Sequence, residues 1–334
     1  MTTNRDVIAV LGAGSWGTAL AHLLARRDCA VRLWSRDAAT AQQLRDDNQN
    51  TRYLPDISLQ DIEIHHDLDV AIDGANWIVS AVPCAALPDL ARHASTRCSH
   101  DAIVVSGTKG LHPETSLLAS QTWSRAGLDA QRFVVLSGPN LAREVAQDIP
   151  TSSVVASRNE NALSRAQKLF STPTFRVYTN DDLLGVELGG ALKNVVAIAA
   201  GISDGLGLGD NAKAALMTRA WREMTRLATA LGARESTLFG LSGMGDLIAT
   251  CASAQSRNHT LGFKLGRGES LGMAQHEIAQ VAEGVHTCRA ALQLAKNAHI
   301  ELPISSQVAA ILFEGRSPRE AVEELMKRAG CREF

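Results

Sequence analysis

The chain lacks the cysteine pairs that bind zinc or hold small secreted domains together. Its six cysteines are scattered, and no two of them form a C-x-x-C pair. Paired spacing is the usual sign of a zinc site or a disulfide framework, so the sequence predicts neither, and no metal is expected. Scattered cysteines are typical of small core residues in a reducing compartment.

Three further absences narrow the class of protein. Lys and Arg number 33 against 35 Asp and Glu, so there is no basic surplus for binding nucleic acid. The first predicted strand begins at Asp6 or Val7, with no apolar signal segment before it. The most apolar window, residues 183–202, contains Glu187 and Lys193, which makes it a poor membrane span. We therefore expect a cytoplasmic protein without nucleic-acid partners or membrane insertion.

Two kinds of pattern divide the 334 residues. Up to about residue 185, short apolar runs alternate with helical spacing, and beyond it the strand signals stop. The alternation predicts an α/β fold: a Rossmann-type, mostly parallel sheet domain over residues 1–185, followed by an all-helical domain over residues 186–334. The predicted strands cover residues 7–11, 30–34, 62–64, 77–82, 102–106, 133–137, 153–156 and 175–178, and the helices of the second domain include residues 187–201, 211–231, 284–298, 304–313 and 317–329.

A glycine-rich turn follows the first predicted strand and precedes a helical pattern. Gly12, Gly14 and Gly17 form the G-x-G-x-x-G arrangement of dinucleotide-binding proteins. The first glycine permits a tight turn, the second lets the backbone approach a pyrophosphate, and the third lets the helix pack on the strand. The helix N-terminus then offers free N–H groups to the anion.

The end of the second predicted strand bears on the choice of cofactor. NAD enzymes usually place an Asp or Glu there to bind the ribose 2′-hydroxyl. Ser35 and Arg36 occupy that place, and Arg36 can pair with a 2′-phosphate. The sequence therefore favours NADPH, while Asp37, one residue further on, leaves NADH open.

The helix predicted over residues 187–201 is apolar on nearly every face, which is typical of a buried helix. Lys193 lies in its middle, and burying an ammonium without a partner is very costly. We therefore expect Lys193 either to be paired or to face a cleft. Gly189 and Gly190 weaken the helix, but they would let the sheet domain and a nicotinamide come close.

Further polar residues stand where ligands commonly bind. Lys109 and Gly138 follow predicted strands, and Asn140 is placed to cap the next helix. In the second domain, a glycine-rich loop over residues 241–247 delivers Asp246 into a helix start. Residues 256–258 (Ser-Arg-Asn) suit a phosphate, and residues 281–284 form a short loop with one acid. These residues by themselves predict an NADP-dependent oxidoreductase with a small anionic substrate.

Six of these stretches occur in the order seen in bacterial NAD(P)-dependent sn-glycerol-3-phosphate dehydrogenases, which the chain resembles from residue 7 to about residue 325. They are residues 12–17, 106–110, 137–139, 187–194, 241–246 and 256–258. The resemblance implies the two-domain plan of the 6-phosphogluconate dehydrogenases. It also implies reversible reduction of dihydroxyacetone phosphate by NADPH or NADH to sn-glycerol 3-phosphate, for phospholipid synthesis. A homodimer is compatible with it.

The resemblance also implies roles for individual positions. Lys193 matches the family's proton donor and acceptor. The positions that match substrate contacts are Lys109, Gly138, Asn140, Lys193, Asp246, Ser256, Arg257 and Asn258. Those that match cofactor contacts are Gly12, Gly14, Ser15, Trp16, Gly17, Arg36, Tyr53, Lys109, Ala142, Arg257, Val281 and Glu283. The family usually has Ser or Thr where Asn140 stands, and Asn also offers a donor and an acceptor.

The residue types suit the reaction. An ammonium within reach of a carbonyl oxygen stabilises the negative charge that develops there and delivers a proton. A neighbouring cation such as Lys109 would bring the pKa of Lys193 towards working pH. Asp246 would either orient Lys193 or hold a substrate hydroxyl, and the sequence leaves both roles open.

Two other functions compete with this one. A 3-hydroxyacid or 6-phosphogluconate-type dehydrogenase shares the domain plan and a helix-borne lysine, but the Lys109 loop and residues 256–258 argue against it. A catalytically silent NADP-binding sensor would be expected to have lost Lys193 or Asp246, and both are present.

Overall fold

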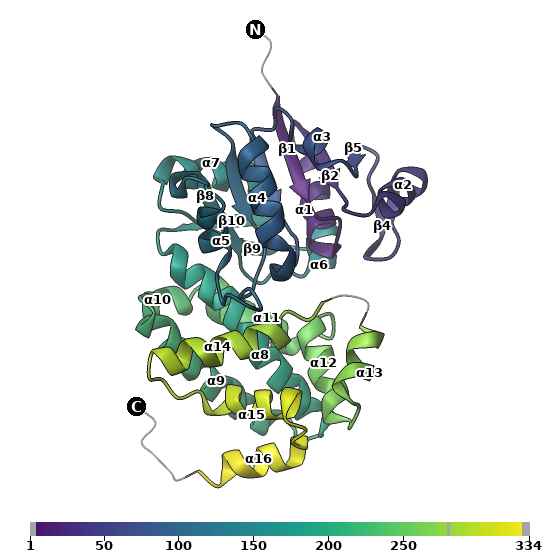
Figure 1. Cartoon of the computed structure of the whole chain (residues 1–334). Helices are drawn as coiled ribbons and strands as arrows, with labels where there is room; N and C mark the ends of the chain where they lie inside the picture. The colour runs from purple at the N-terminus through teal and green to yellow at the C-terminus, as the bar shows by residue number, and fades with distance from the viewer. Residues whose placement is uncertain (1–4, 279–280, 329–334) are drawn as a thin grey trace. The chain divides into compact units, whose positions relative to one another are not determined.

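The computed structural model describes residues 5–278 and 281–328. By its internal contacts the chain forms two compact units (Figure 1). The sheet unit comprises Met1–Lys109 and Leu117–Glu187, and the helical unit comprises Gly110–Ser116 and Leu188–Phe334. The division falls within one long helix, α8 (Leu183–Gly205).

An eight-stranded sheet forms the sheet unit, with the strand order β10-β9-β8-β7-β6-β1-β2-β5. Its strands are β1 (Asp6–Leu11), β2 (Cys29–Trp34), β5 (Ile62–His65), β6 (Trp77–Ser80), β7 (Ile103–Ser106), β8 (Phe133–Ser137), β9 (Thr151–Ala156) and β10 (Phe175–Asn180). Neighbouring strands pair in parallel except β8 and β9, which are antiparallel. The predicted mostly parallel sheet is confirmed, and the stretch expected to be a minor strand, β5, pairs with β2 at the sheet edge.

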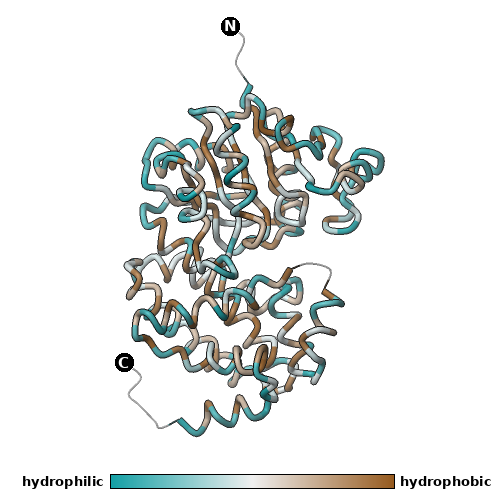
Figure 2. Tube along the Cα trace, in the orientation of Figure 1, coloured by the Kyte–Doolittle hydropathy of each residue, from teal (hydrophilic) through white to brown (hydrophobic). Residues whose placement is uncertain are grey.

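Helices cover the sheet because its central strands are largely apolar, as the brown central strands of Figure 2 show, and β6, β7 and β8 are buried at every position. Ile8, Ala9, Val10 and Leu11 of β1 are all fully buried, so neither face of this strand is left to solvent. The helices of this unit are α1 (Ser15–Ala25), α2 (Ala38–Asp47), α3 (Leu68–Ile72), α4 (Leu87–Arg97), α5 (Ala119–Arg125), α6 (Ala142–Ala146) and α7 (Glu160–Phe170), with short 3₁₀ turns at Cys84–Ala86 and Ala130–Arg132.

A small antiparallel hairpin, which the sequence analysis did not predict, lies beside α1. It consists of β3 (Gln49–Asn50) and β4 (Leu54–Ser58). Leu54 and Ile57 form an apolar cluster with Ala19 of α1 and Ala146 of α6. This cluster holds the hairpin against the helix that follows the glycine turn.

The helical unit contains α9 (Asp210–Ala230), α10 (Glu235–Leu238), α11 (Asp246–Ala252), α12 (Arg257–Gly266), α13 (Leu271–Glu277), α14 (Gly284–Asn297), α15 (Pro303–Phe313) and α16 (Pro318–Met326) besides its part of α8. The predicted helical character is confirmed for the described residues. Ser317 caps α16 as expected, while Ala329, the predicted end of that helix, lies outside the described residues. One stretch differs from expectation, because Leu241–Gly245 forms a π-helical turn that continues directly into α11 instead of a loop.

Helix α8 is buried by the elements that surround it. It is long and apolar enough to cross a membrane, but 94% of its most apolar window is buried inside the protein, as for a core helix. Its backbone contacts that of α12 directly: a Cβ on Gly201 would overlap the His259 carbonyl, and one on Gly262 would overlap the Ile198 carbonyl. This close packing brings the start of α12 beside the middle of α8.

Candidate active site

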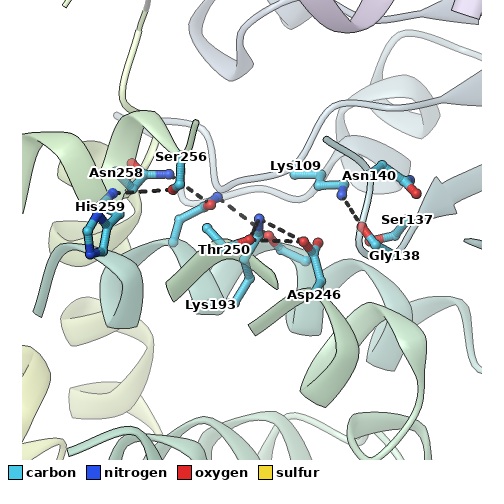
Figure 3. Close-up of polar contacts among 12 residues, drawn as sticks. Lys109, Ser137, Gly138, Asn140, Lys193, Asp246, Thr250, Ser256, Asn258 and His259 are labelled. Atoms are coloured by element: carbon cyan, nitrogen blue, oxygen red, sulfur yellow. Dashed lines mark hydrogen bonds and ion pairs between the residues drawn. The ribbon is translucent and has the colours of Figure 1, made fainter. Parts of the chain in front are cut away.

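Lys193 is buried and paired. Its side chain is 9% exposed, and its Nζ lies 3.0 Å from Asp246 Oδ1 and 2.7 Å from Thr250 Oγ1 (Figure 3). Thr250 in turn donates to Asp246 Oδ1 over 3.1 Å. The three groups form a closed triangle, so the cost of burying the ammonium is offset by a carboxylate and a hydroxyl. The first of the two arrangements expected for Lys193 is therefore the one observed.

Local structure explains how Asp246 and Thr250 reach the lysine. Asp246 is the first residue of α11 and Thr250 stands four residues later, so both project from one face of the helix. The π-helical turn before α11 packs against α8, where a Cβ on Gly189 would lie 2.9 Å from the Ser242 carbonyl oxygen. At Gly189, the backbone that approaches closely is that of Ser242, in the same unit.

Asn194, the residue after Lys193, connects three helices. Its Oδ1 accepts from Asn258 Nδ2 over 2.9 Å, and Asn258 Oδ1 accepts from the Gly284 N–H over 2.9 Å. Asn258 is buried, and both ends of its amide are engaged. The amide pair therefore ties α8 to the first residues of α12 and α14.

The remaining residues predicted in this unit surround the starts of α12 and α14. Ser256 caps α12 by accepting the His259 N–H. Arg257 is exposed and donates to the Val281 carbonyl over 3.2 Å, and Glu283 occupies the N-cap position of α14. The structure thus brings Ser256, a predicted substrate contact, near Val281 and Glu283, which are predicted cofactor contacts, with Arg257, assigned to both, between them.

In the sheet unit, the three glycines of the turn differ in their surroundings. Gly12 has a φ of +116°, and a Cβ on Gly17 would overlap the Gly12 carbonyl oxygen. A Cβ on Gly14, by contrast, would meet nothing within 4 Å. Gly12 and Gly17 are needed by the fold, whereas Gly14 leaves open space at the N-terminus of α1, where an anion is favoured.

Four predicted cofactor contacts gather at the same helix N-terminus. Ser15 Oγ donates to the Tyr53 carbonyl over 3.2 Å. The Trp16 indole N–H is buried and has no hydrogen-bond partner among the described residues, and a Cβ on Gly107 would lie 2.6 Å from it. Ala142 packs against the same apolar cluster as Trp16. These features and the open Gly14 fit a dinucleotide.

Arg36 and Asp37 differ in their contacts and exposure. Asp37 is the N-cap of α2, and its Oδ2 accepts from the Thr40 hydroxyl over 2.6 Å and from the Thr40 N–H over 2.7 Å. These two hydrogen bonds hold the pKa of the Asp37 carboxyl below its ordinary value. Arg36 is exposed. The carboxylate is thus engaged by the helix that follows, while the guanidinium remains at the surface.

Lys109 and Gly138 lie together. Lys109 Nζ donates to the Gly138 carbonyl over 2.7 Å (Figure 3), and Gly138 has a φ of +138° that favours glycine. Asn140 does not cap α6, which was the expectation. Leu141 holds the N-cap position, and Asn140 Nδ2 donates to Ser153 Oγ over 3.1 Å. Asn140 Oδ1 is buried without a hydrogen-bond partner among the described residues, so this amide keeps an acceptor available.

Two residues next to Lys193 in the structure, Thr250 and Asn194, have no role predicted from the sequence. Thr250 had a detectable signal, since it follows Asp246 by one helical turn. Asn194 lies inside the family stretch 187–194 but has no predicted role, because its partner Asn258 is 64 residues away in the chain.

Comparison with known proteins gives one consistent result. A family model described as NAD-dependent glycerol-3-phosphate dehydrogenase N-terminus matches residues 7–163, and the corresponding C-terminus model matches residues 182–323. Glycerol-3-phosphate dehydrogenase (NAD(P)+) of Pelotomaculum thermopropionicum is 46% identical over 330 residues, which cover 98% of this chain and 95% of the relative.

Solved structures agree with the sequence relatives. The crystal structure of glycerol-3-phosphate dehydrogenase from Coxiella burnetii matches with a TM-score of 0.93 at 40% identity, covering 97% of this chain and 99% of that chain. A ketopantoate reductase family structure from Ralstonia eutropha matches with a TM-score of 0.57 at 15% identity, over 96% of this chain and 99% of that chain, and shows the fold alone. The predicted fold class is confirmed by these matches.

Proposed function

The chain belongs to the NAD-dependent glycerol-3-phosphate dehydrogenase family, and we propose that it reversibly reduces dihydroxyacetone phosphate to sn-glycerol 3-phosphate. It is an NAD(P)-dependent oxidoreductase, as its closely similar relatives are named. We further propose that it acts in the cytoplasm, as a source of glycerol 3-phosphate for phospholipid synthesis, and as a homodimer. The observation that carries the proposal is the buried Lys193, held by Asp246 and Thr250.

Lys193 is the group we assign to proton transfer. Its ammonium would donate a hydrogen bond to the C2 carbonyl oxygen, stabilise the negative charge that develops there, and deliver the proton. Asp246 and Thr250 restrict the ammonium to one place, so it needs little rearrangement when substrate binds. In this proposal Asp246 orients Lys193, since it contacts Lys193 directly in the same unit.

The phosphate of the substrate requires cations and backbone donors. Arg257, exposed at the start of α12 and beside the Ser256 cap, is suited to a phosphate. Lys109, Gly138 and Asn140 are the contacts we assign in the sheet unit. Binding energy at the phosphate supports the orientation of C2, because it is gained away from the reacting carbon.

The cofactor would be held by the turn at residues 12–17, with Arg36 near the adenosine ribose and Tyr53 and Ala142 beside the turn. When bound, the reduced nicotinamide supplies the hydride. NADPH is the preferred form in this proposal for two reasons. Arg36 is an exposed cation, and the neighbouring Asp37 carboxylate is already engaged as a helix cap.

The direct test is an assay at about 340 nm, where reduced nicotinamides absorb, with dihydroxyacetone phosphate and either NADPH or NADH. We expect turnover with both cofactors and a lower KM for NADPH. A 3-hydroxyacid, assayed in the oxidation direction with NADP⁺ or NAD⁺ as hydride acceptor, serves as the competing substrate. Turnover of the 3-hydroxyacid alone, or binding of NADPH without turnover of either compound, would overturn the proposed reaction. Sedimentation of the same preparation reports whether a homodimer forms.

A further inference from the structure

We propose that Asn50 is a positioning residue for the dinucleotide-binding turn, which it orients from the β3–β4 hairpin. The inference deepens the proposed function and rests on the assignment of residues 12–17 to the cofactor. Asn50 is not among the residues assigned to the site from the sequence. It is 2% exposed, and two hydrogen bonds connect its side chain to the glycine turn and to α1.

Both amide hydrogens of Asn50 are directed at the glycine turn and its helix. Nδ2 donates to the Ala13 carbonyl over 3.0 Å and to Thr18 Oγ1 over 2.8 Å. A carboxamide nitrogen has two hydrogens, so these bonds use its full donor capacity. Ala13 stands between Gly12 and Gly14, and Thr18 is fully buried in the first turns of α1. Asn50 therefore links the turn to the helix that follows it.

The hydrogen bond from Asn50 to the Ala13 carbonyl also constrains the N–H of Gly14. The Ala13 carbonyl and the Gly14 N–H belong to one planar, trans peptide unit and point in opposite directions. Because Asn50 holds the carbonyl, it also fixes the direction of the Gly14 N–H, away from the hairpin. Gly14 itself permits a wide range of φ, so this peptide would otherwise have more freedom to rotate.

The hairpin has anchors other than Asn50. Leu54 and Ile57 anchor it through the apolar cluster with Ala19 and Ala146. A second polar contact, from Ser15 Oγ to the Tyr53 carbonyl, joins the hairpin to the first turn of α1. Removing the Asn50 amide should therefore leave the hairpin docked and free the Ala13–Gly14 peptide.

A purely structural role for Asn50 predicts something different. In that case its loss would lower stability and leave the affinity of the folded protein for NADPH unchanged. A matched control exists in Asn76, whose Oδ1 accepts from the Val7 N–H over 2.9 Å at the opposite end of β1. Asn76 also anchors backbone next to this strand, but far along it from the glycine turn.

The test compares Asn50→Ala, Asn50→Asp and Asn76→Ala, with NADPH affinity measured by the fluorescence of the reduced cofactor. We expect Asn50→Ala to raise the NADPH Kd roughly tenfold. The reason is that the Gly14 N–H, a backbone donor to the anionic cofactor, loses its fixed orientation. Asn50→Asp keeps the shape, loses the donor, and should raise the Kd at least as much. In both variants kcat and the KM for dihydroxyacetone phosphate should change less than about twofold, and Asn76→Ala should leave the NADPH Kd unchanged.

Only titrations that reach full stoichiometry count, so a partly unfolded variant is not mistaken for a weak binder. An unchanged NADPH Kd in both Asn50 variants overturns the proposal, as does an equal loss of affinity in Asn76→Ala. Because the measurement needs no turnover, it is independent of the reaction. Wild-type protein that binds NADPH but does not reduce dihydroxyacetone phosphate contradicts the proposed function and leaves the Asn50 comparison informative. Wild-type protein that binds no NADPH contradicts both.

Discussion

Lys193 and Asp246 are in contact at 3.0 Å although they stand on different helices, and both side chains are almost completely buried. A buried ammonium and carboxylate are mutually dependent, since removing one leaves the other charge without compensation. Thr250 touches both groups and limits their geometry. The ammonium of Lys193 is thus held by two partners that also contact each other.

Replacement of Lys193 tests its assignment to proton transfer. Lys193→Met keeps the stem of the side chain and removes the ammonium, and kcat should fall by roughly a hundredfold to ten-thousandfold. NADPH affinity should remain close to wild type, because the glycine turn is unaltered. The measurement is steady-state turnover together with NADPH fluorescence titration. Turnover within tenfold of wild type would remove Lys193 from its role.

Thr250→Val tests whether the hydroxyl positions the ammonium. The variant is nearly isosteric and removes the hydrogen bonds to Lys193 and Asp246, so we expect kcat to fall about tenfold or more. Thr218 offers a control, because its hydroxyl donates to the Ala214 carbonyl on an exposed part of α9. Thr218→Val should leave kcat unchanged, and equal kinetics in the two variants would argue against a role for Thr250.

Gly189→Ala tests the close approach of α8 to the π-helical turn. The added Cβ would lie 2.9 Å from the Ser242 carbonyl oxygen, and relief of that contact moves the turn that leads into Asp246. We expect a loss of stability of about 1–3 kcal/mol and a lower kcat. Gly272 in α13 is the control, since a Cβ there meets nothing within 4 Å and should be neutral or stabilising. Thermal unfolding of both variants decides the point.

Arg36→Ala tests the preference for NADPH. Loss of a charge-assisted contact with the 2′-phosphate should raise the KM for NADPH roughly tenfold or more and leave the KM for NADH nearly unchanged. Asp37→Asn keeps a capping residue at the start of α2 and should alter neither KM much. A variant of Arg36 with the same cofactor ratio as wild type would contradict this assignment.

Glu187 makes the stability of the protein depend on pH. Burial raises the pKa of its carboxyl to about 7, against an ordinary value of 4.5, despite the hydrogen bonds from the Ser120 hydroxyl and N–H. Between these two values the unfolded chain has released the proton that the folded protein still binds. Stability should therefore be greatest below the ordinary value and decline, by up to about 1.4 kcal/mol per pH unit, as pH rises towards 7.

Glu187→Gln removes this titration while keeping an acceptor for the Ser120 N–H. The difference in unfolding free energy between the variant and the wild-type protein should grow with pH over this window and then level off. Urea unfolding at several pH values provides the measurement. A constant difference across the window would show that Glu187 has an ordinary pKa.

The sequence by itself determined the features that depend on neighbouring residues. An apolar run, the glycine turn at residues 12–17 and a helical repeat are contiguous, and their backbone requirements are local, so the first strand, turn and helix could be predicted with their order. The motifs of the family are also contiguous, which is why the family prediction is confirmed by the comparisons.

The tertiary structure decided which residues meet, because those contacts join positions far apart in the chain. Thr250 reaches Lys193 across 57 residues, and Asn50 reaches Ala13 across 37. It also corrected one local expectation, because Asn140 contacts Ser153 and Leu141 holds the N-cap position of α6. Such contacts result from how elements distant in the chain pack together, and packing sums many weak interactions that no short stretch of sequence contains.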